Sequence, residues 1–431
     1  MKRMNVTKIS KKLIAATALI LIFSTVGFSQ STNYNKLAGQ QVNNNLNTIT
    51  TAVPFLIITP DSRAGGMGDA GVASSPDVNS IHWNPSKLAF VDKKMGIGVS
   101  YTPWLRALVP DINLAYLSFF YKTKKRGTIG ASLRYFSLGD ITFTDANGTT
   151  IGNFRPNEFA IDVAYGVKLS KTFSAGGAVR YINSNLTGGT FVDGSATKAG
   201  RTVAVDISAL WRNDKIKLGG KKTIAAIGLN ISNIGGKVTY SDRGGRGSSD
   251  FLPINMRLGG SLTFQMDDYN SISIEVDANK LLVPTPPVYK HKIVDTNGVA
   301  YDQGVAYDAN GDPEILFGKN PNRGVTEGIF GSFNDAPGGG KEELREINYA
   351  CGLEYWYNKL FAVRAGYFYE NPYKGNRQFF TLGAGVKYNV FGLDFAYLIP
   401  TQQRNPLENT LRFTLTFDFD AFKAQNDEKT E

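Results

Sequence analysis

Several sets of residues in this chain have types and spacings that suggest ligand chemistry. Gly66, Gly68 and Gly71 satisfy the G-x-G-x-x-G pattern of dinucleotide-binding turns. Such a turn must join a strand to a helix inside a βαβ unit, whereas Pro60 and Pro76 flank the motif here and interrupt regular structure. We therefore predict that the motif binds no nucleotide and that its glycines serve backbone geometry.

A second set could hold a cation. Asp308, Asn310 and Asp312 resemble the first ligands of a calcium-binding loop. A loop of that kind continues with a glycine and closes with a glutamate, but Pro313 and Lys319 occupy those positions. Asx turns are the favoured explanation of the run, and calcium binding in this loop stays open as the alternative.

The residues that catalysis needs are few. The chain contains two histidines, His82 and His291, and one cysteine, Cys351. A Ser–His–acid arrangement would require one of these histidines, but His82 lies beside Trp83 and Asn84 in what we interpret as a structural turn. A single cysteine excludes an internal disulfide framework and a cysteine-rich metal site. We predict a protein that is not an enzyme and that uses no cofactor or metal.

The stretch from residue 61 to residue 90 matches neither a helix nor a strand. Its glycines permit close backbone approach and positive φ, and its prolines stop regular structure. A surface linker is one interpretation, but it gives Met67, Val72, Ile81, Trp83 and Leu88 no reason to be apolar. We instead predict a compact plug inside a hollow structure. The expected plug residues are Asp61, Arg63, Gly65, Gly66, Gly68, Asp69, Gly71, His82, Trp83, Asn84 and Pro85.

The elements expected to enclose this plug are β-strands. After residue 90 apolar residues recur at every second position: Leu411, Phe413 and Leu415 share one face of a strand, and Arg412 and Thr414 share the other. The fold class that we predict is all-β, a transmembrane antiparallel β-barrel of about fourteen strands with an N-terminal plug. The strands are expected at residues 95–103, 111–121, 127–137, 157–169, 172–183, 201–212, 222–234, 253–265, 270–282, 346–357, 360–370, 377–388, 390–399 and 409–419.

The connections between these strands favour a membrane barrel over a soluble β-sandwich. Mostly short hairpins, such as those at 122–126 and 266–269, alternate with much longer loops. That asymmetry is typical of periplasmic turns and extracellular loops, and an even number of strands places both termini in the periplasm. The long loops are expected at 138–156, 184–200, 235–252 and 283–345.

The first residues have the pattern of an export signal. Five cations between Lys2 and Lys12 precede an apolar run at residues 13–23, and cleavage after Ser29 is expected. No later apolar run reaches the roughly 18 residues of a transmembrane helix. The predicted organisation is a signal peptide at 1–29, a flexible periplasmic segment at 30–50, the plug at 51–92, the barrel at 93–420 and a periplasmic tail at 421–431.

Composition and charge are compatible with this organisation. The hydrophobic content is 42% and the mean hydropathy is −0.19, values that suit a barrel because only every second strand residue faces lipid. The formal charge of +10 falls by the five cations of the signal to about +5. So small an excess, without a long basic arm, argues against nucleic acid as a partner.

The strand face opposite the lipid carries charges of both signs. Pairing among these side chains would offset their desolvation inside a plugged barrel. A substrate path through the lumen is the alternative, and the sequence leaves both open. The expected lumen-facing charges are Arg134, Asp162, Arg180, Asp206, Arg257, Glu275, Asp277, Arg364, Lys387, Asp394 and Arg412.

Two of the long loops could bind a partner. Phe191 and Val192 lie between glycine-rich flanks in the loop 184–200, where an exposed aromatic can act as a protein-binding anchor. Packing of both side chains on the barrel rim is the alternative. The loop 283–345 is longer than a simple connector needs, and we expect a lid or a docking surface there.

One run also carries a family resemblance. AVPFLIITPDSRAGGMGDAGVASSPDVNSIHWNPSKLAF, residues 52–90, resembles the amino-terminal signature of the PorV (LptO) family, the outer-membrane shuttle proteins of the type IX secretion system. The resemblance implies a barrel similar to the fatty-acid transporters (FadL-like), with fourteen strands and an amino-terminal hatch. It also implies a Gram-negative outer-membrane protein that works at the cell surface.

The family role gives the expected function and partners. The resemblance implies that the protein binds cargo by its C-terminal signal domain at the translocon barrel (SprA or Sov). It then implies delivery to the attachment complex that contains the PorU sortase. The alternative is a transporter of fatty acids or other hydrophobic small molecules, which needs an apolar lumen where the sequence predicts a polar and charged one. A lipid A-modifying enzyme is a third possibility, but the chain lacks a nucleophile and base pair for it.

Overall fold

The computed structural model describes residues 46–106, 109, 111–123, 127–144, 147–189, 191–192, 195–241, 249–296, 299–402 and 405–419. The predicted signal peptide, most of the segment 30–50 and the tail 421–431 lie outside these residues. No helix within the described ranges is long and apolar enough to cross a membrane.

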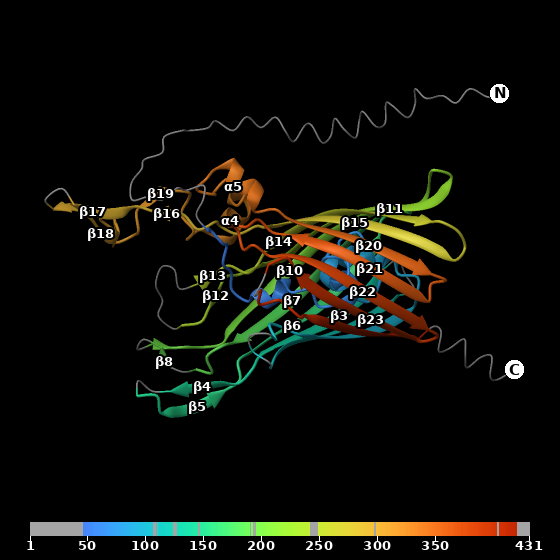
Figure 1. The fold of residues 1–431 in the computed structure, drawn as a ribbon, viewed down its shortest axis with the longest axis horizontal. Helices are drawn as coiled ribbons and strands as arrows, with labels where there is room; N and C mark the ends of the chain where they lie inside the picture. The colour runs from blue at the N-terminus through green and yellow to red at the C-terminus, as the bar shows by residue number, and fades with distance from the viewer. Residues whose placement is uncertain are drawn as a thin grey trace, which may run out of the picture. The chain divides into compact units, whose positions relative to one another are not determined.

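Fourteen antiparallel strands form a closed barrel (Figure 1), and each strand pairs with its two neighbours. The first and last strands close the wall with a register that runs from Gly96 opposite Asp418 to Tyr101 opposite Phe413. The fold class predicted from the sequence is therefore confirmed. The barrel strands are β1 (Met95–Pro103), β2 (Ile112–Lys122), β3 (Gly127–Leu138), β6 (Asn157–Lys168), β7 (Phe173–Asn185), β10 (Gly200–Leu218), β11 (Lys221–Gly235), β14 (Asn255–Gln265), β15 (Asn270–Leu281), β20 (Asn348–Tyr357), β21 (Phe361–Tyr369), β22 (Gln378–Tyr388), β23 (Phe391–Pro400) and β24 (Leu411–Asp418).

The predicted strands agree with the observed ones to within two residues at each end, except at one hairpin. The connection expected at 213–221 is instead strand, because β10 continues to Leu218 and β11 begins at Lys221. Gly219 and Gly220 turn the chain with φ values of 56° and 79°. Two residues at positive φ form the tight turn that matches the twist of paired strands, so this hairpin extends past the turn that joins β6 to β7.

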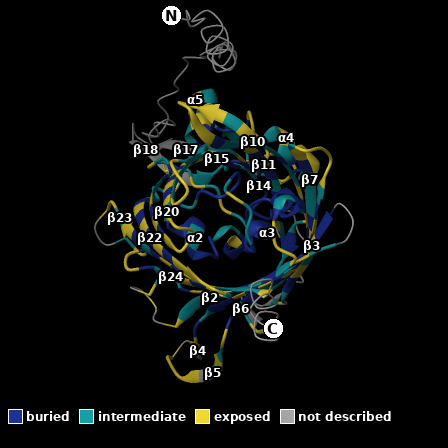
Figure 2. Cartoon of the chain, turned by 90° about the vertical axis from the view of Figure 1, so that its right-hand side faces the viewer, coloured by how far each residue is buried: buried dark blue, intermediate teal, exposed yellow. Residues whose placement is uncertain are grey.

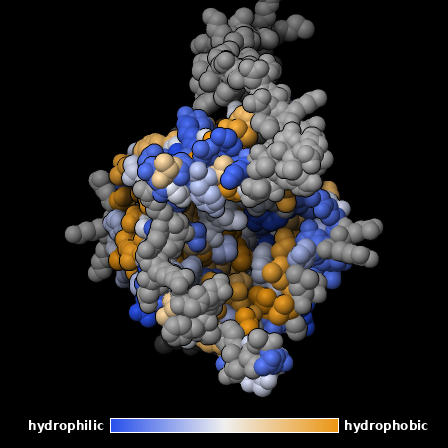
Figure 3. Space-filling model, turned by 90° about the vertical axis from the view of Figure 1, so that its left-hand side faces the viewer, coloured by the Kyte–Doolittle hydropathy of each residue, from blue (hydrophilic) through white to orange (hydrophobic). Residues whose placement is uncertain are grey.

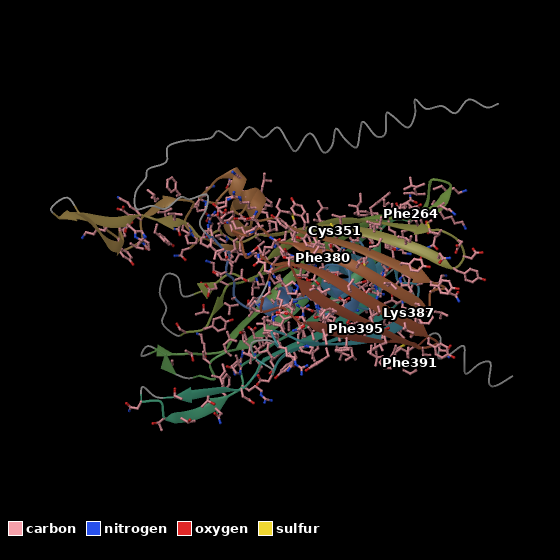
Figure 4. All side chains as sticks on the ribbon, viewed as in Figure 1. Phe264, Cys351, Phe380, Lys387, Phe391 and Phe395 are labelled. Carbon is pink, nitrogen blue, oxygen red and sulfur yellow. The ribbon has the colours of Figure 1, made fainter. Side chains whose placement is uncertain are left out.

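Side chains alternate across the barrel wall as the sequence pattern predicts. Along β21 and β22, Val363 and Leu382 are exposed on the outside, whereas Arg364 and Thr381 are buried inside. Phe380, Phe391 and Phe395 lie on the outer surface of β22 and β23 (Figure 4). An apolar outer face with interfacial aromatics is the surface that lipid requires.

Short helices fill part of the interior (Figure 2). We predicted neither helix nor strand for residues 61–90, and that prediction is wrong for three brief segments there; a fourth short helix precedes them. Each is confined to a turn or two by its caps and prolines: the Asp61 side chain caps one helix and Pro85 begins another. The segments are η1 (Pro54–Ile57), α2 (Ser62–Gly65), α3 (Ser80–Trp83) and η2 (Pro85–Phe90).

The long loops carry their own small elements at one end of the barrel (Figure 1). Residues 283–345, here called the lobe, pair β16 with β19 and β17 with β18 and contain two helices. The loop elements are β4 (Ile141–Thr144), β5 (Thr150–Phe154), β8 (Phe191–Val192), β9 (Ser195–Ala196), β12 (Val238–Thr239), β13 (Ser249–Asp250), β16 (Val288–Tyr289), β17 (His291–Thr296), β18 (Val299–Val305), β19 (Ile315–Phe317), α4 (Val325–Gly331) and α5 (Gly340–Arg345).

The chain enters the barrel from this long-loop end. The Asn47 side chain donates hydrogen bonds to the Pro286 carbonyl (3.1 Å) and to Glu342 Oε1 (2.9 Å), and its backbone N–H donates to the Tyr373 carbonyl. The described part of the segment 30–50 thus lies among the long loops, not at the end of the short turns where we expected it. The chain crosses the interior before β1 begins at the short-turn end.

Candidate functional site: the interface between the internal segment and the barrel wall

Residues 52–56 fill the long-loop half of the interior with apolar side chains. Phe55 and Leu56 are buried, and the Phe55 ring stacks on Phe136 at a centroid distance of 6.1 Å. Arg134 donates hydrogen bonds to the carbonyls of Phe55 and Leu56, so the backbone there is also satisfied. We predicted polar and charged inward faces, and that prediction is wrong for this half. The other buried members of the apolar cluster are Ala52, Val53, Leu114, Ala160, Ile182, Ala204, Val238, Phe251, Leu252, Ile254, Leu282 and Val283.

Asp61 ties two parts of the internal segment together. Its Oδ2 accepts from the backbone N–H of Ala64 (3.0 Å) at the start of α2, and its Oδ1 accepts from Trp83 Nε1 (2.7 Å). Burial, reinforced by the charge of Asp77, raises the pKa of the Asp61 carboxyl to about 6. The carboxyl therefore acts as a structural hydrogen-bond acceptor between α2 and α3.

Arg63 connects this segment to the wall through a chain of ion pairs. Its Nη1 donates to Asp77 Oδ2 (2.9 Å), and its Nε and Nη2 donate to the two oxygens of Glu354 on β20 (2.9 and 2.7 Å). Glu354 also accepts from Arg364 (2.7 Å), which pairs with Asp394 at the same distance. Two-point contacts of this kind fix orientation as well as position.

The glycines of residues 65–71 allow backbone to lie directly against the wall. Gly68 adopts φ 69°, and its backbone N–H donates to Thr381 Oγ1 (2.8 Å). Its nitrogen lies so close to Gly366 of the wall that a Cβ on Gly366 would overlap it. A Cβ on Gly71 would overlap the Trp83 ring. A Cβ on Gly66 would likewise lie 3.0 Å from the Cα of Gly383 in the wall strand β22. The G-x-G-x-x-G spacing thus serves close backbone contact.

Carboxylates of β15 hold the next residues by their backbone N–H groups. Asp277 Oδ2 accepts from Gly71 (2.8 Å) and Val72 (3.0 Å), and Glu275 Oε1 accepts from Ala73 (2.8 Å). Asp69 pairs with Arg412 (2.7 Å), whose side chain also lies against Gly65.

The run from His82 to Pro85 is packed from all sides. His82 Nδ1 lies 2.6 Å from Arg134 Nη2, and burial together with the charge of Arg134 holds the pKa of the imidazole well below its usual range. The Trp83 ring lies under the Arg257 guanidinium at 4.5 Å. Asn84 donates to the carbonyls of Val72 (3.0 Å) and Ala209 (3.2 Å). These contacts are structural and offer no substrate position.

The predicted lumen charges fall into two groups. Arg180 pairs with Asp162 and Asp206, and Arg364 and Arg412 have the carboxylate partners named above. Arg257 donates instead to Asn279 Oδ1 (2.6 Å), and Lys387 lies over the Trp356 ring at 4.6 Å. We did not predict that Asp77, Lys87 and Glu354 take part in this interface. Glu354 could have been found from the alternation of β20, because it shares the inward face with Ala350 and Gly352.

The remaining predicted residues lie apart from this interface. Phe191 and Val192 form β8, paired with β9, and their side chains lie outside the described part of the structure. Cys351 is exposed on β20, and His291 begins β17 in the lobe. The described residues contain no cluster of three or more His, Cys, Asp or Glu side chains that could hold a metal. Asp308 Oδ1 accepts from the backbone N–H groups of Asn310 and Asp312, as an Asx turn does.

The protein-family model described as "Type IX secretion system protein PorV" matches residues 40–288. No curated protein matches the chain in sequence. Among solved structures, the Ralstonia pickettii toluene transporter TbuX is 11% identical, with a TM-score of 0.44 over 86% of this chain and 98% of that one. A Pseudomonas aeruginosa FadL homologue is 12% identical, with a TM-score of 0.43 over 86% and 99%. The Pseudomonas putida toluene transporter TodX is 12% identical, with a TM-score of 0.44 over 86% and 97%.

Proposed function

Because the chain belongs to the PorV family of type IX secretion system proteins, we propose that it binds secreted cargo at the translocon and carries it to the cell-surface attachment complex. In this proposal the cargo is recognised by its C-terminal signal domain, the translocon barrel is SprA or Sov, and the attachment complex contains the PorU sortase. The protein works in the outer membrane and without a catalytic step of its own.

The observation that carries the proposal is the filled interior. The segment 51–92 is fixed to the wall by Arg63–Glu354, Asp69–Arg412 and backbone bonds to Asp277. We propose that this segment is a permanent plug, formed by the residues from Asp61 to Pro85 that the sequence singles out. Because a plugged barrel offers no path through its interior, a partner protein would bind its loops. The lobe and the other long loops lie together at one end (Figure 1).

Phe191 is the residue that we propose as the protein-binding anchor, with Val192 beside it. Truncating a central aromatic anchor commonly weakens binding by about 2 kcal/mol or more. Phe191→Ala should therefore reduce surface display of cargo and co-purification with the translocon, at unchanged barrel abundance. Tyr307→Ala, at an exposed aromatic of the lobe, is the matched comparison. If only the Tyr307 variant loses both activities, the anchor is in the lobe and the role of Phe191 is wrong.

A transporter of fatty acids or other hydrophobic small molecules is the second candidate. It is favoured by the apolar long-loop half, where hydrophobic residues gather in the hollow seen in Figure 3. Residues 52–56 occupy that compartment, which argues against passage. Deleting the gene separates the two functions: loss of cargo display with normal lipid uptake supports shuttling, and the reverse result supports transport.

A further inference from the structure

The short-turn end of the barrel carries a set of inward-facing basic residues, here called the mouth cations. They follow the inward positions of their strands: Lys122 continues the series of Tyr116, Ser118 and Phe120, all buried. Lys387 near the end of β22 is seen at this end in Figure 4. The mouth cations are Lys122, Lys168, Arg212, Lys217, Lys222 and Lys387.

Their interactions differ from those of cations deeper in the barrel. Arg63, Arg180 and Arg364 each form ion pairs with two carboxylates. None of the mouth cations has an ion pair with a described residue. The direct contacts of three of them are to neutral groups: Lys122 donates to the Val91 carbonyl, Lys168 lies over the Phe90 ring and Lys387 over the Trp356 ring.

The extended β10–β11 hairpin concentrates this charge. Lys217 lies directly opposite Lys222 in its register, and both side chains are exposed. Like charges opposite one another destabilise a strand pair. The pairing of β10 with β7 ends at Trp211, so residues 213–218 extend past that neighbour with β11 as their strand partner. The hairpin therefore holds two unneutralised cations over the mouth of the barrel.

Lipid headgroups do not explain the direction of these side chains. Lysines that serve the membrane interface reach outward along the apolar wall, whereas the mouth cations share the face of the buried residues Leu210, Ala226 and Phe120. On the outward face of the same hairpin, Ile227 and Leu218 are exposed and apolar, and Lys221 opposite Leu218 is the lysine that faces the membrane interface. The anion that this surface fits would lie beneath the barrel, on the aqueous side.

We propose that the mouth cations form a docking surface for an acidic polypeptide segment on the short-turn side of the membrane. An extended chain with several carboxylates can contact cations on separate strands at once, and it would relieve the repulsion between Lys217 and Lys222. Electrostatic contacts of this kind are weak singly and add their effect over a set. The proposal does not depend on cargo binding at the opposite end.

The test uses the full-length protein in phosphatidylcholine nanodiscs and a fluorescent synthetic peptide in which glutamate alternates with serine. The wild type should bind this peptide, and the binding should weaken as salt is added. The triple variant Lys168→Gln, Lys217→Gln, Lys222→Gln should bind about tenfold more weakly. A peptide with glutamine in place of glutamate should not bind.

The matched control removes the same charge from the same end. Lys171→Gln, Lys221→Gln and Lys359→Gln change exposed lysines in turns or on the outward face, and should alter affinity less than about twofold. Both triple variants should keep the wild-type heat-modified gel mobility. Equal losses in the two variants, or no peptide binding by the wild type, would overturn the proposal. The proposal would also be overturned if the wild type bound phosphatidylglycerol vesicles and the first triple variant did not, because lipid would then be the partner.

Discussion

Two regions of the barrel interior hold the internal segment by different interactions. At the long-loop end Phe55 and Leu56 pack among apolar side chains of the wall. In the middle, Arg63, Glu354 and Arg364 form a buried ionic chain. Apolar contact is non-directional and tolerates small shifts, whereas a buried ion pair needs each partner in place. We infer that the ionic layer sets the position of the internal segment and that the apolar layer contributes contact area.

The largest expected effect comes from breaking the ionic layer. Arg364→Met keeps the volume of the side chain but leaves Asp394 buried without its cation and leaves Glu354 with Arg63 as its remaining ion-pair partner. Removal of one partner from a buried pair typically costs about 3–5 kcal/mol. The temperature at which the barrel changes to its unfolded gel mobility should fall sharply. Arg155 and Asp140 form an ion pair in which both side chains are exposed, so Arg155→Met should leave that temperature unchanged. An equal fall in the Arg155 variant would show that burial of the ion pair does not matter.

A smaller effect is expected in the apolar half. Phe55→Ala removes a buried ring stacked on Phe136. Such truncations cost about 3–5 kcal/mol, and the lower end applies where the site can collapse, as we expect among the small side chains of this cluster. The same gel transition measures the loss. Leu46→Ala, at a side chain that is 71% exposed, serves as the control. If Phe55→Ala exceeds Arg364→Met in its effect, the apolar layer holds the segment and our inference is wrong.

The smallest effect concerns the lobe, which lies outside both layers. Burial and the charge of Glu343 raise the pKa of Asp335 from 3.8 to about 6, although Arg323 opposes the shift. A carboxyl with a raised pKa binds its proton more tightly in the folded protein, so its contribution is present below pH 3.8 and is lost as pH rises through about 6. The free energy of local unfolding of the lobe should therefore be higher by about 1 kcal/mol at the acidic end of this window. Proteolysis of the lobe should be correspondingly slower there. Asp335→Asn should remove the dependence, and a variant with the wild-type pH profile would contradict the assignment.

Much of the fold could be predicted because its signals are local. The alternation of Leu411 to Phe417 identifies a strand and its two faces without knowledge of any partner. The hairpin at Gly219 and Gly220 was placed less well, because the run 212–218 is too polar to show the alternation. The capping role of Asp61 and the turn from Asn84 into Pro85 also follow from neighbouring residues. The burial of these residues inside a barrel does not follow from their neighbours in the sequence.

The sequence by itself determined the strand number, the faces of each strand and the run of residues that had to be enclosed, since each depends on neighbours along the chain. The tertiary structure alone decided the partners: Arg63 meets Glu354 across 291 positions and Ser62 meets Thr414 across 352. It also decided that the chain enters among the long loops and that apolar residues fill that half. Pairings across such separations depend on the register of the closed barrel, because a shift of one residue would turn every inward side chain toward the lipid.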